Sequence, residues 1–343
     1  MSLIFVILAL MAGVLCEKKD GGKAYRIPLN DGNAIPTLGL GTWLGFGGGE
    51  TDDKAVENSV KWALEAGYRL IDTAAAYQDE EQVGAGVRAS GVPREDIFIV
   101  TKLLHNEERD VLTSLRNSLS RLNMSYVDLY LIHTPVAYKP DYSGYDIIDY
   151  VDTWKAMEEA KKLGLAKSIG ISNFNISQIE RLLAHSEIKP SVLQVEVNLN
   201  LQQNKVVDFC KSHDIVVMAY TPFGSLFSKD SKAPVTKADD PTLVAIAKKY
   251  GKTTPQIALR YLVQIGVVPI PKTLKKSRVE ENIDVFDFEF TKDEMETLAK
   301  LNKDYRTVFP TFWQSHPYYP FERVDHPSPD PFLKQTSESK HTA

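Results

Sequence analysis

The sequence predicts a closed (β/α)8 barrel, and three observations carry that prediction. Short apolar runs without polar alternation recur eight times along the 343 residues. Such runs are typical of parallel strands that are buried on both faces. Amphipathic stretches of helical period separate them, as in a series of strand–helix units. The length and the 43% hydrophobic content suit one barrel-sized domain.

A β-hairpin is expected before the barrel, because Asp31-Gly32 lies between two short apolar runs at 25–29 and 34–36. The eight barrel strands are predicted at 38–42, 68–72, 97–102, 127–133, 166–172, 192–197, 216–220 and 267–271. The helices are predicted at 51–66, 81–90, 109–122, 151–163, 176–185, 205–214, 241–250 with 254–263, and 277–283.

Capping residues mark several helix boundaries. Ser177 precedes Glu180 at the spacing of a capping box. Gly164 and Gly251 follow helical runs, where a left-handed residue is expected. Thr253-Thr254-Pro255 offers a hydroxyl cap followed by proline at the first helical position.

Both ends of the chain depart from the barrel pattern. Residues 1–16 are uncharged and apolar, which predicts a cleaved signal peptide, although the usual basic start is missing. The alternative is an apolar extension or anchor. Residues 306–321 are rich in aromatic side chains and should pack on the barrel as an irregular C-terminal loop. The barrel domain is expected to span 17–324, and the polar residues 325–343 are expected to be disordered.

Composition limits the possible partners. A net charge of −5 argues against nucleic acid. Of the two cysteines, Cys16 and Cys210, cleavage after residue 16 would leave only Cys210, and no disulfide framework is then possible. A membrane partner is not expected, because the apolar leader is too short to span a bilayer. A metal-dependent hydrolase needs clustered His and carboxylate ligands, but only His105 and His133 lie near the predicted mouth. If the chain is secreted, the glycosylation sequons at Asn123 and Asn175 become relevant.

Four ionisable residues come at the ends of three successive predicted strands. Asp72, Lys102 and His133 each close a strand, and Tyr77 follows one loop after the first. These strand ends meet at the mouth of a (β/α)8 barrel, where active sites are built. Each residue alone fits a structural role, but together they suit proton transfer.

The chemistry of a carbonyl reduction assigns a role to each of the four residues. Tyr77 is expected to give its proton to the carbonyl oxygen, and the Lys102 ammonium to lower the pKa of Tyr77. Asp72 pairs with Lys102 to keep it charged, and His133 orients the carbonyl.

These residues and their flanking sequence resemble the aldo-keto reductase family over residues 25–321. The matching motifs are Gly39–Trp43, Gly67–Ala74, Leu129–His133, Ile169–Phe174 and Ile270–Thr273. The resemblance implies that the four residues form the family's catalytic tetrad. Members that reduce a ring C=C bond carry Glu at the His position, so His133 implies carbonyl reduction.

The cofactor prediction begins from the absence of a Rossmann motif. Gly39-Leu40-Gly41 is followed by Leu44 where a third glycine would stand. Lys272, Thr273 and Arg278 instead flank the last strand and the start of its helix, where two cations and a hydroxyl suit a phosphate. A solvated basic turn is the alternative.

The resemblance implies that the cofactor is NADPH and assigns each part of it to residues of this chain. It places the 2′-phosphate on Lys272, Thr273 and Arg278, and the adenine on Glu281 and Asn282. The remaining groups implied are Ser172, Asn173 and Gln194 for the carboxamide, Tyr220 for stacking on the nicotinamide, and Thr221, Phe223 and Ser225 for the pyrophosphate, with Phe223 alternatively a pocket wall.

The substrate pocket is expected to involve Trp43, Leu104, Thr134 and Trp313. Many aldehyde-reducing members carry tryptophan at the positions of Leu104 and Thr134, and the loop after His133 looks shortened. The pocket should therefore be wider, less aromatic and less covered, which favours a bulky ketone. Drift in a broad-range enzyme is the alternative.

The leader and this pocket together resemble the secreted insect enzymes that reduce the steroid ketone 3-dehydroecdysone. The expectation is a monomeric, secreted, NADPH-dependent carbonyl reductase that binds NADPH before its substrate. A broad-range aldehyde reductase, a catalytically silent NADPH-binding barrel and a cytoplasmic location are the alternatives, since reduced cofactor is scarce outside cells.

Overall fold

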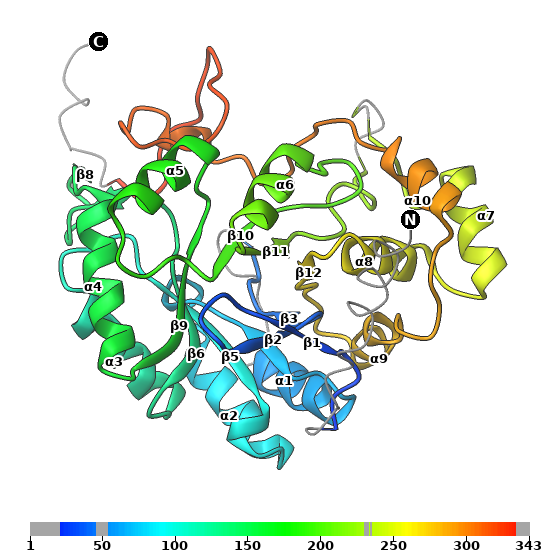
Figure 1. The fold of residues 1–343 in the computed structure, drawn as a ribbon, viewed down its shortest axis with the longest axis horizontal. Coiled ribbons are helices and arrows are strands. Elements are labelled where there is room, and N and C mark those ends of the chain that lie inside the picture. Colours follow the sequence, from blue (N-terminus) through cyan, green and yellow to red (C-terminus); the bar gives the residue numbers. More distant parts are fainter. Residues whose placement is uncertain (1–20, 46–53, 230–232, 234, 334–343) are drawn as a thin grey trace, which may run out of the picture.

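The computed structural model describes residues 21–45, 54–229, 233 and 235–333, and it confirms the predicted barrel (Figure 1). Eight parallel strands form one sheet in the order β12-β11-β10-β9-β6-β5-β4-β3. Their bounds are β3 Leu40–Gly41, β4 Leu70–Asp72, β5 Phe98–Leu103, β6 Val127–Ile132, β9 Ala166–Ser172, β10 Val192–Glu196, β11 Val216–Tyr220 and β12 Val268–Pro269. The predicted signal peptide lies outside the described residues.

The first and last strands meet and close the barrel. Gly41 forms a parallel bridge with Lys272, and its backbone N–H donates to the Pro271 carbonyl at 3.1 Å. A Cβ atom at Gly41 would lie 2.8 Å from the carbonyl oxygen of Ile270. Only glycine permits this approach, so the Gly39-Leu40-Gly41 sequence serves closure of the sheet.

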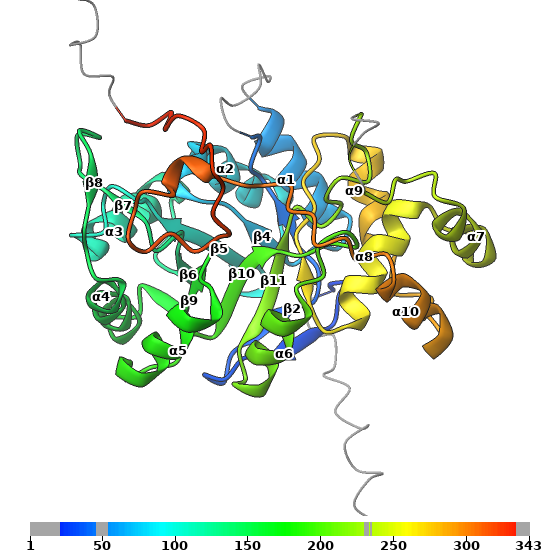
Figure 2. The same cartoon turned by 90° about the horizontal axis from the view of Figure 1, so that it is seen from above.

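Helices cover the outside of the barrel (Figures 1 and 2). Their bounds are α1 Ala55–Glu65, α2 Glu80–Ser90, α3 Val111–Leu122, α4 Tyr150–Lys162, α5 Ile176–His185, α6 Asn204–Ser212, α7 Pro241–Tyr250, α8 Thr254–Gln264, α9 Lys276–Ile283 and α10 Lys292–Ala299. The sequence prediction lacked α10. In the part of the chain that the structure describes, no helix is long and apolar enough to cross a membrane.

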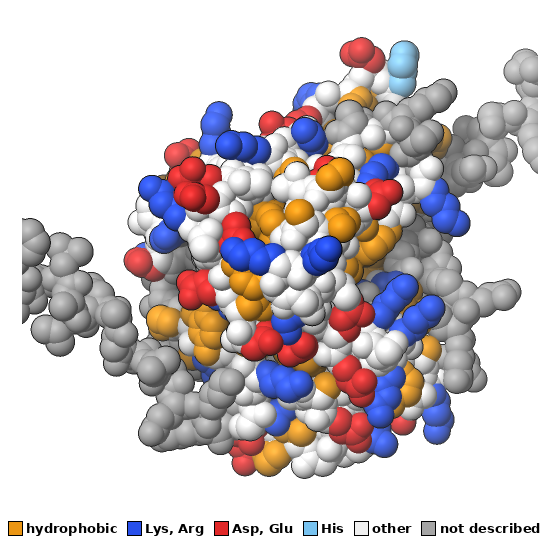
Figure 3. Space-filling view, turned by 90° about the vertical axis from the view of Figure 1, so that its right-hand side faces the viewer, with side chains coloured by type: hydrophobic (Ala, Val, Ile, Leu, Met, Phe, Trp, Pro, Cys, Tyr) orange, Lys and Arg blue, Asp and Glu red, His pale blue; other side chains and the backbone are white. Residues whose placement is uncertain are grey.

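The predicted hairpin forms β1 Arg26–Pro28 and β2 Ala34–Pro36, paired antiparallel. It contributes Leu29 and Ile35 to the apolar cluster inside the barrel, so it closes the end opposite the strand carboxyl termini. A larger apolar cluster lies between the strands and the helices. The side of the molecule shown in Figure 3 carries basic, acidic and apolar side chains interspersed.

The predicted caps are mostly confirmed. Gly164 and Gly251 have φ of +72° and +64°, and the Thr253 side chain caps α8 in a capping box with Gln256. The predicted Ser177–Glu180 box is wrong. Asn175 and Gln178 form the capping box of α5, because the N-cap residue of this helix is Asn175, two residues before Ser177.

The C-terminal loop packs on the barrel as predicted, and Figure 2 shows it crossing from the α9–α10 side toward the hairpin β7 Ala137–Tyr138 and β8 Tyr145–Asp146. The expectation of disorder from residue 325 is wrong for residues 325–333. Asp330 Oδ2 accepts hydrogen bonds from the hydroxyls of Tyr138 at 2.7 Å and Tyr145 at 2.9 Å. Residues 334–343 lie outside the described part.

Candidate active site

The barrel brings Asp72, Tyr77 and Lys102 into one hydrogen-bonded group. Lys102 Nζ donates to Asp72 Oδ1 at 2.7 Å, to the Thr73 carbonyl at 2.9 Å and to the Tyr77 hydroxyl at 3.1 Å. The Lys102 side chain is fully buried. The three hydrogens of the ammonium thus have three acceptors, which fixes its position below the Tyr77 hydroxyl.

The strands determine this arrangement. Asp72 is the last residue of β4, Lys102 lies near the end of β5, and His133 follows β6 directly. Tyr77 ends a short 3-10 turn, η1 Ala75–Tyr77, after which Gln78 reverses the chain with φ of +59°. The prediction of four groups converging at the barrel mouth is therefore confirmed as geometry.

Burial and pairing act in opposite directions on Asp72 and Lys102. Burial raises the pKa of Asp72, whereas the Lys102 ammonium lowers it. Burial likewise lowers the pKa of Lys102, and Asp72 opposes that change. Breaking such a buried pair by removing one partner costs about 3–5 kcal/mol, so the pair positions the ammonium firmly.

Tyr77 is held in its protonated form. Burial raises the pKa of its hydroxyl well above the usual value, and the carboxylates of Asp72 and Asp79 add to the increase. The expectation that Lys102 would lower this pKa is wrong in its net direction, because desolvation of a phenolate outweighs the nearby ammonium. Tyr77 therefore enters the reaction with its proton.

His133 is a neutral imidazole in this site. Burial lowers its pKa well below the usual value, and the charge of Lys102 adds to this. The ring packs edge-on against Tyr77 with centroids 5.6 Å apart. A neutral imidazole has one N–H donor. Tyr77 and His133 can thus both donate a hydrogen bond to one carbonyl oxygen between them.

The predicted carboxamide and stacking residues lie against the tetrad. Asn173 Nδ2 donates to the His133 carbonyl at 2.9 Å and to Ser172 Oγ at 3.2 Å, and the Tyr220 hydroxyl donates to Asn173 Oδ1 at 2.8 Å. Gln194 Nε2 donates to Asp72 Oδ2 at 2.6 Å. Amide and hydroxyl groups suited to a carboxamide therefore surround the reaction centre.

The predicted phosphate residues lie after β12 and at the start of α9. Lys272 and Arg278 are exposed, and neither side chain forms an ion pair with any residue in the described ranges. Thr273 Oγ1 accepts the backbone N–H of Lys275 at 3.1 Å. Two cations without a protein counter-ion near a helix start fit a phosphate group.

The two predicted adenine residues differ in their surroundings. The Glu281 carboxylate accepts a hydrogen bond from Thr253 Oγ1 at 2.5 Å, so it is already tied to the start of α8. Asn282 is buried in α9.

The predicted pyrophosphate loop is anchored to the C-terminal segment. Thr221 has φ of +48°, and its carbonyl accepts the N–H of Gly224 at 2.8 Å. Ser225 Oγ lies 3.1 Å from Thr307 Oγ1. Phe223 is half-buried beside the exposed ring of Phe227, with centroids 6.0 Å apart. The loop thus has the hydroxyl groups that a pyrophosphate requires.

Together these residues fit NADPH. When bound, the cofactor supplies a hydride to the carbonyl carbon. The chain's own groups suit the rest of the chemistry: the donors of His133 and Tyr77 can hold a carbonyl oxygen, and Tyr77 can give it a proton as negative charge develops there. The Lys102 ammonium, 3.1 Å from the Tyr77 oxygen, stabilises the phenolate that remains.

Three of the four predicted substrate residues lie close to the tetrad or directly follow it in the chain. The Trp43 ring centre is 6.4 Å from that of Tyr77. Leu104 is half-buried two residues after Lys102, and Thr134 is buried directly after His133. Trp313 comes from the C-terminal segment, and its Nε1 donates to the Tyr138 hydroxyl at 2.7 Å.

The expectation of a less aromatic and less covered mouth needs correction. Leu104 and Thr134 do lack aromatic rings, but the β7–β8 hairpin and the C-terminal segment bring rings from elsewhere. This aromatic cluster, named so below, consists of His105, Tyr138, Tyr142, Tyr145, Phe312, Trp313 and Phe332. Burial lowers the pKa of His105 to about 4, so its ring is neutral within the cluster.

Sequence reasoning missed three acidic residues around the site. Glu196 ends β10 and accepts the backbone N–H groups of Thr307 and Val308, both at 2.8 Å, which fastens the C-terminal segment. Asp330 fastens the same segment further along. Asp79 adds a buried carboxylate beside Thr73. Of the three, only Glu196 could have been predicted from the sequence, because it is a carboxylate that ends an apolar strand run.

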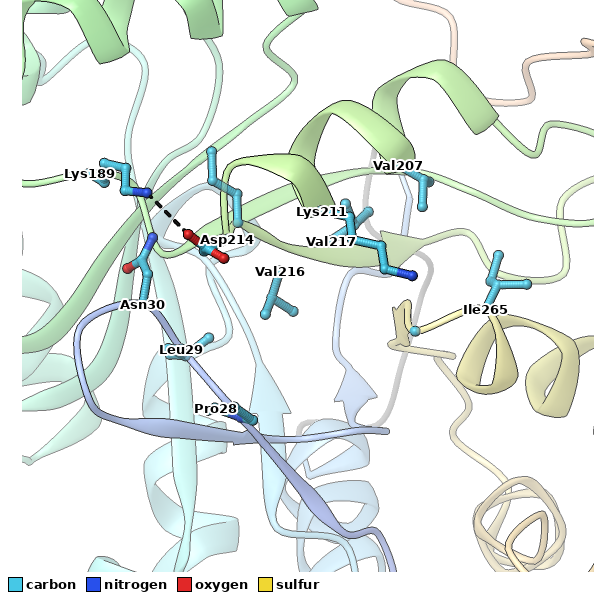
Figure 4. A pocket seen from close by; sticks show the side chains of 12 residues that line it. Pro28, Leu29, Asn30, Lys189, Val207, Lys211, Asp214, Val216, Val217 and Ile265 are labelled. Carbon is cyan, nitrogen blue, oxygen red and sulfur yellow. Dashed lines mark hydrogen bonds and ion pairs between the residues drawn. The ribbon is translucent and has the colours of Figure 1, made fainter. Parts of the chain in front are cut away.

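A cavity of about 460 Å³ lies at the other end of the barrel (Figure 4). Its walls include Pro28 and Leu29 of the hairpin, Val216 at the start of β11, and Gly266 before β12. The barrel residues among these precede or begin β11 and β12, whereas the tetrad lies at strand ends, so this cavity is separate from the reaction centre. Among the described residues, no group of three or more His, Cys, Asp or Glu is arranged to hold a metal.

Comparison with known proteins agrees with this geometry. The model of the aldo/keto reductase family matches residues 37–303. Aldo-keto reductase AKR2E4 from Bombyx mori is 49% identical, with 87% of this chain and 99% of that protein covered. Estradiol 17 beta-dehydrogenase 5 from Mus musculus is 43% identical, with 87% and 98% covered.

Solved structures give the same result. The crystal structure of Bombyx mori AKR2E4 in complex with NADP is 47% identical and has a TM-score of 0.83, with 87% of this chain and 99% of that chain covered. The structure of AKR2E5 complexed with NADPH is 44% identical and has a TM-score of 0.86, with 90% and 97% covered. With its barrel, its converging tetrad and these relatives, the chain belongs to the aldo/keto reductase family and is an NADP(H)-dependent oxidoreductase.

Proposed function

We propose that this enzyme reduces a bulky alicyclic ketone, such as 3-dehydroecdysone, in preference to small aldehydes. The observation that carries the proposal is the pair of non-aromatic side chains, Leu104 two residues after Lys102 and Thr134 directly after His133. Neither has the volume of an indole, so a fused-ring substrate has more room beside Tyr77 and His133.

The named relatives support a bulky substrate. Estradiol 17 beta-dehydrogenase 5 from Mus musculus is named for a steroid, and Prostaglandin F synthase 1 from Bos taurus for a prostaglandin. Both are similar to this chain over 87% of its length. The aromatic cluster supplies apolar rings that can pack on the faces of an alicyclic substrate.

The test is a comparison of kcat/KM for NADPH-dependent reduction of 3-dehydroecdysone and of a small aromatic aldehyde by residues 17–343. Leu104→Trp and Thr134→Trp should each lower kcat/KM for the steroid by about 10-fold or more, because overfilling a packed site costs roughly 1–3 kcal/mol. The same variants should keep their activity toward the aldehyde.

Val244→Trp is the matched control, since Val244 is 46% exposed on α7. It adds an indole far from the reaction centre and should leave kcat/KM unchanged for both substrates. Equal losses for steroid and aldehyde in the Leu104 and Thr134 variants would contradict the proposal. A wild-type preference for the aldehyde would favour the alternative, a broad-range aldehyde reductase.

We further propose that the protein is secreted as a monomer after removal of residues 1–16. The apolar, uncharged composition of that segment supports the first part. The two sequons then offer a test. Asn123 is exposed at the end of α3, whereas the Asn175 side chain is occupied in the capping box of α5 and donates to the Pro320 carbonyl.

Expression of the full chain in insect cells should therefore give a secreted product that starts at residue 17 and carries a glycan at Asn123 but not at Asn175. Mass spectrometry of the medium and of an Asn123→Gln variant measures this directly. Retention of an unmodified chain inside the cells would contradict secretion and favour a cytoplasmic enzyme. Light scattering of the purified product tests the prediction that the protein is a monomer.

A further inference from the structure

The start of α2 carries a buried carboxylate that the chemistry above does not use. Asp79 is 4% exposed and occupies the N-cap of α2. An Asp at this position ordinarily accepts hydrogen bonds from the first free backbone N–H groups of the helix. The Asp79 side chain makes no such capping bond. The needs of the helix therefore do not explain where this carboxylate lies.

Asp79 is instead connected to the catalytic ammonium through Thr73. Thr73 Oγ1 donates a hydrogen bond to Asp79 Oδ1 at 2.5 Å, and the Thr73 carbonyl accepts one from Lys102 Nζ at 2.9 Å. Thr73 is fully buried, so water does not compete for either bond. One residue thus contacts both the carboxylate and the ammonium.

The second oxygen of Asp79 is left without a well-oriented partner. Asp79 Oδ2 and Thr42 Oγ1 are both buried and form no hydrogen bond of good geometry with any described residue. The hydroxyl still lies near enough to help lower the pKa of Asp79, which burial raises. A buried carboxylate with a spare oxygen is costly, so a nearby positive charge is needed to offset it.

The charges around Asp79 identify that positive charge as Lys102. Glu80, the next residue, repels Asp79 but is itself neutralised by Arg121 Nε at 2.7 Å. Asp79 has no ion pair of its own within the described chain, and Lys102 is the cation whose field favours its charged form. The titratable groups that interact with it are Glu80 on α2, Lys102 on β5 and Tyr77 in η1.

We propose that Asp79 is a fifth ionisable residue of the reaction centre, a positioning residue that acts through Thr73 and Lys102 and sets the upper pH limit of proton donation by Tyr77. Its negative charge holds the Lys102 ammonium in place and makes a phenolate at Tyr77 harder to form. Tyr77 therefore keeps its proton to higher pH than the ammonium alone would allow. The inference rests on the reductase chemistry and is independent of the bulky-ketone assignment.

The test is the Asp79→Asn variant, which keeps the shape of the side chain and removes its charge. Two quantities are measured: the alkaline limit of kcat/KM for reduction of a small aromatic aldehyde, and the titration of Tyr77 itself. The second comes from the tyrosinate absorbance of each protein minus that of its Tyr77→Phe counterpart. Both midpoints should move to lower pH by about one unit, because one negative charge has left a buried site.

Two variants at Thr73 separate this role from simple packing. Thr73→Val removes the hydroxyl that stabilises the Asp79 carboxylate, so Asp79 becomes protonated and the midpoints shift in the same direction. Thr73→Ser restores the hydroxyl and should restore the wild-type midpoints. Glu158→Gln is the matched control, because Glu158 is a buried carboxylate on α4 that accepts the N–H groups of Glu187 and Ile188.

Unchanged midpoints in Asp79→Asn, with only a lower melting temperature, would overturn the inference and leave Asp79 a structural residue. A shift of equal size in Glu158→Gln would overturn it as well. The absorbance titration needs no substrate. If the enzyme reduces no carbonyl, the proposed reductase function fails, but the titration still tests the role of Asp79.

Discussion

The position of one proton governs the chemistry at the residue scale. Tyr77 lies 3.1 Å from the Lys102 ammonium, yet burial and two carboxylates raise the pKa of its hydroxyl. The proton therefore stays on Tyr77 until negative charge develops on the carbonyl oxygen, and the ammonium then stabilises the new phenolate. The sequence predicted these residues because charged groups close buried strands. It did not predict the net pKa, which depends on burial.

Removal of the Tyr77 hydroxyl should stop turnover without affecting the binding of cofactor. We expect Tyr77→Phe to lower kcat by about 10³-fold, the usual contribution of a general acid, because the variant lacks the hydroxyl that gives its proton to the carbonyl oxygen. NADPH affinity, measured by quenching of protein fluorescence, should stay close to wild type. Tyr250→Phe is the control, since its hydroxyl donates to Glu294 on the surface. Loss of NADPH binding in Tyr77→Phe would count against the assigned role.

Lys272 and Arg278 should discriminate NADPH from NADH, because only NADPH carries a 2′-phosphate. Lys272→Ala and Arg278→Ala should each weaken NADPH binding by about 10- to 100-fold, as expected for a lost charge-assisted hydrogen bond, and weaken NADH binding little. Titrations with both cofactors measure the difference. Lys276→Ala is the control, since Lys276 lies in α9 with Arg278 and its exposed side chain pairs with Glu280. Equal losses for NADPH and NADH would remove the phosphate assignment.

Elements with strong local patterns were predictable, and elements that depend on distant contacts were not. Helix α7 matches its predicted bounds because Asp240 caps it and Gly251 ends it. The β7–β8 hairpin was missed because its strands have two residues each, and its Tyr138 meets Asp330 192 residues later. For α10 a local signal existed, since Thr291 and Glu294 form a capping box.

The C-terminal segment should affect substrate binding more than the chemical step. Asp330→Asn weakens the acceptor shared by Tyr138 and Tyr145, and Phe332→Ala removes a ring from the aromatic cluster. Each variant should raise KM for the bulky ketone several-fold, at roughly 1–2 kcal/mol, with kcat little changed. Limited proteolysis should cleave the C-terminal segment faster in these variants than in wild type. Asp325→Asn, exposed in the same segment, should behave as wild type. A fall in kcat with constant KM would contradict this role.

The closed barrel separates stability from chemistry at the scale of the whole molecule. One end is closed by the β1–β2 hairpin and its apolar contacts, and the other collects the charged groups. Closure itself requires Gly41, where the backbone of β3 approaches Ile270. The sequence predicted the barrel as a whole because each of its eight units repeats the same pattern. The side-chain network across the mouth joins residues from separate units, so no local pattern contains it.

The stability of the whole fold should depend on pH through Glu108, which is buried after β5. Burial raises the pKa of Glu108 to about 8, and Asp146 adds to the increase, although Thr153 donates a hydrogen bond at 3.3 Å. The folded state therefore holds a proton that the unfolded state, with an ordinary carboxyl, has released. Stability is consequently lost as the pH rises between the unfolded and the folded pKa.

Glu108→Gln should remove this loss, because glutamine keeps the shape and never ionises. In urea unfolding at about pH 5 the variant should match wild type, whereas at about pH 9 it should be more stable by about 4 kcal/mol. Glu180→Gln, an exposed position on α5, should follow wild type at both pH values. A difference between Glu108→Gln and wild type that is the same at both pH values would mean that packing, and not the proton, determines the effect.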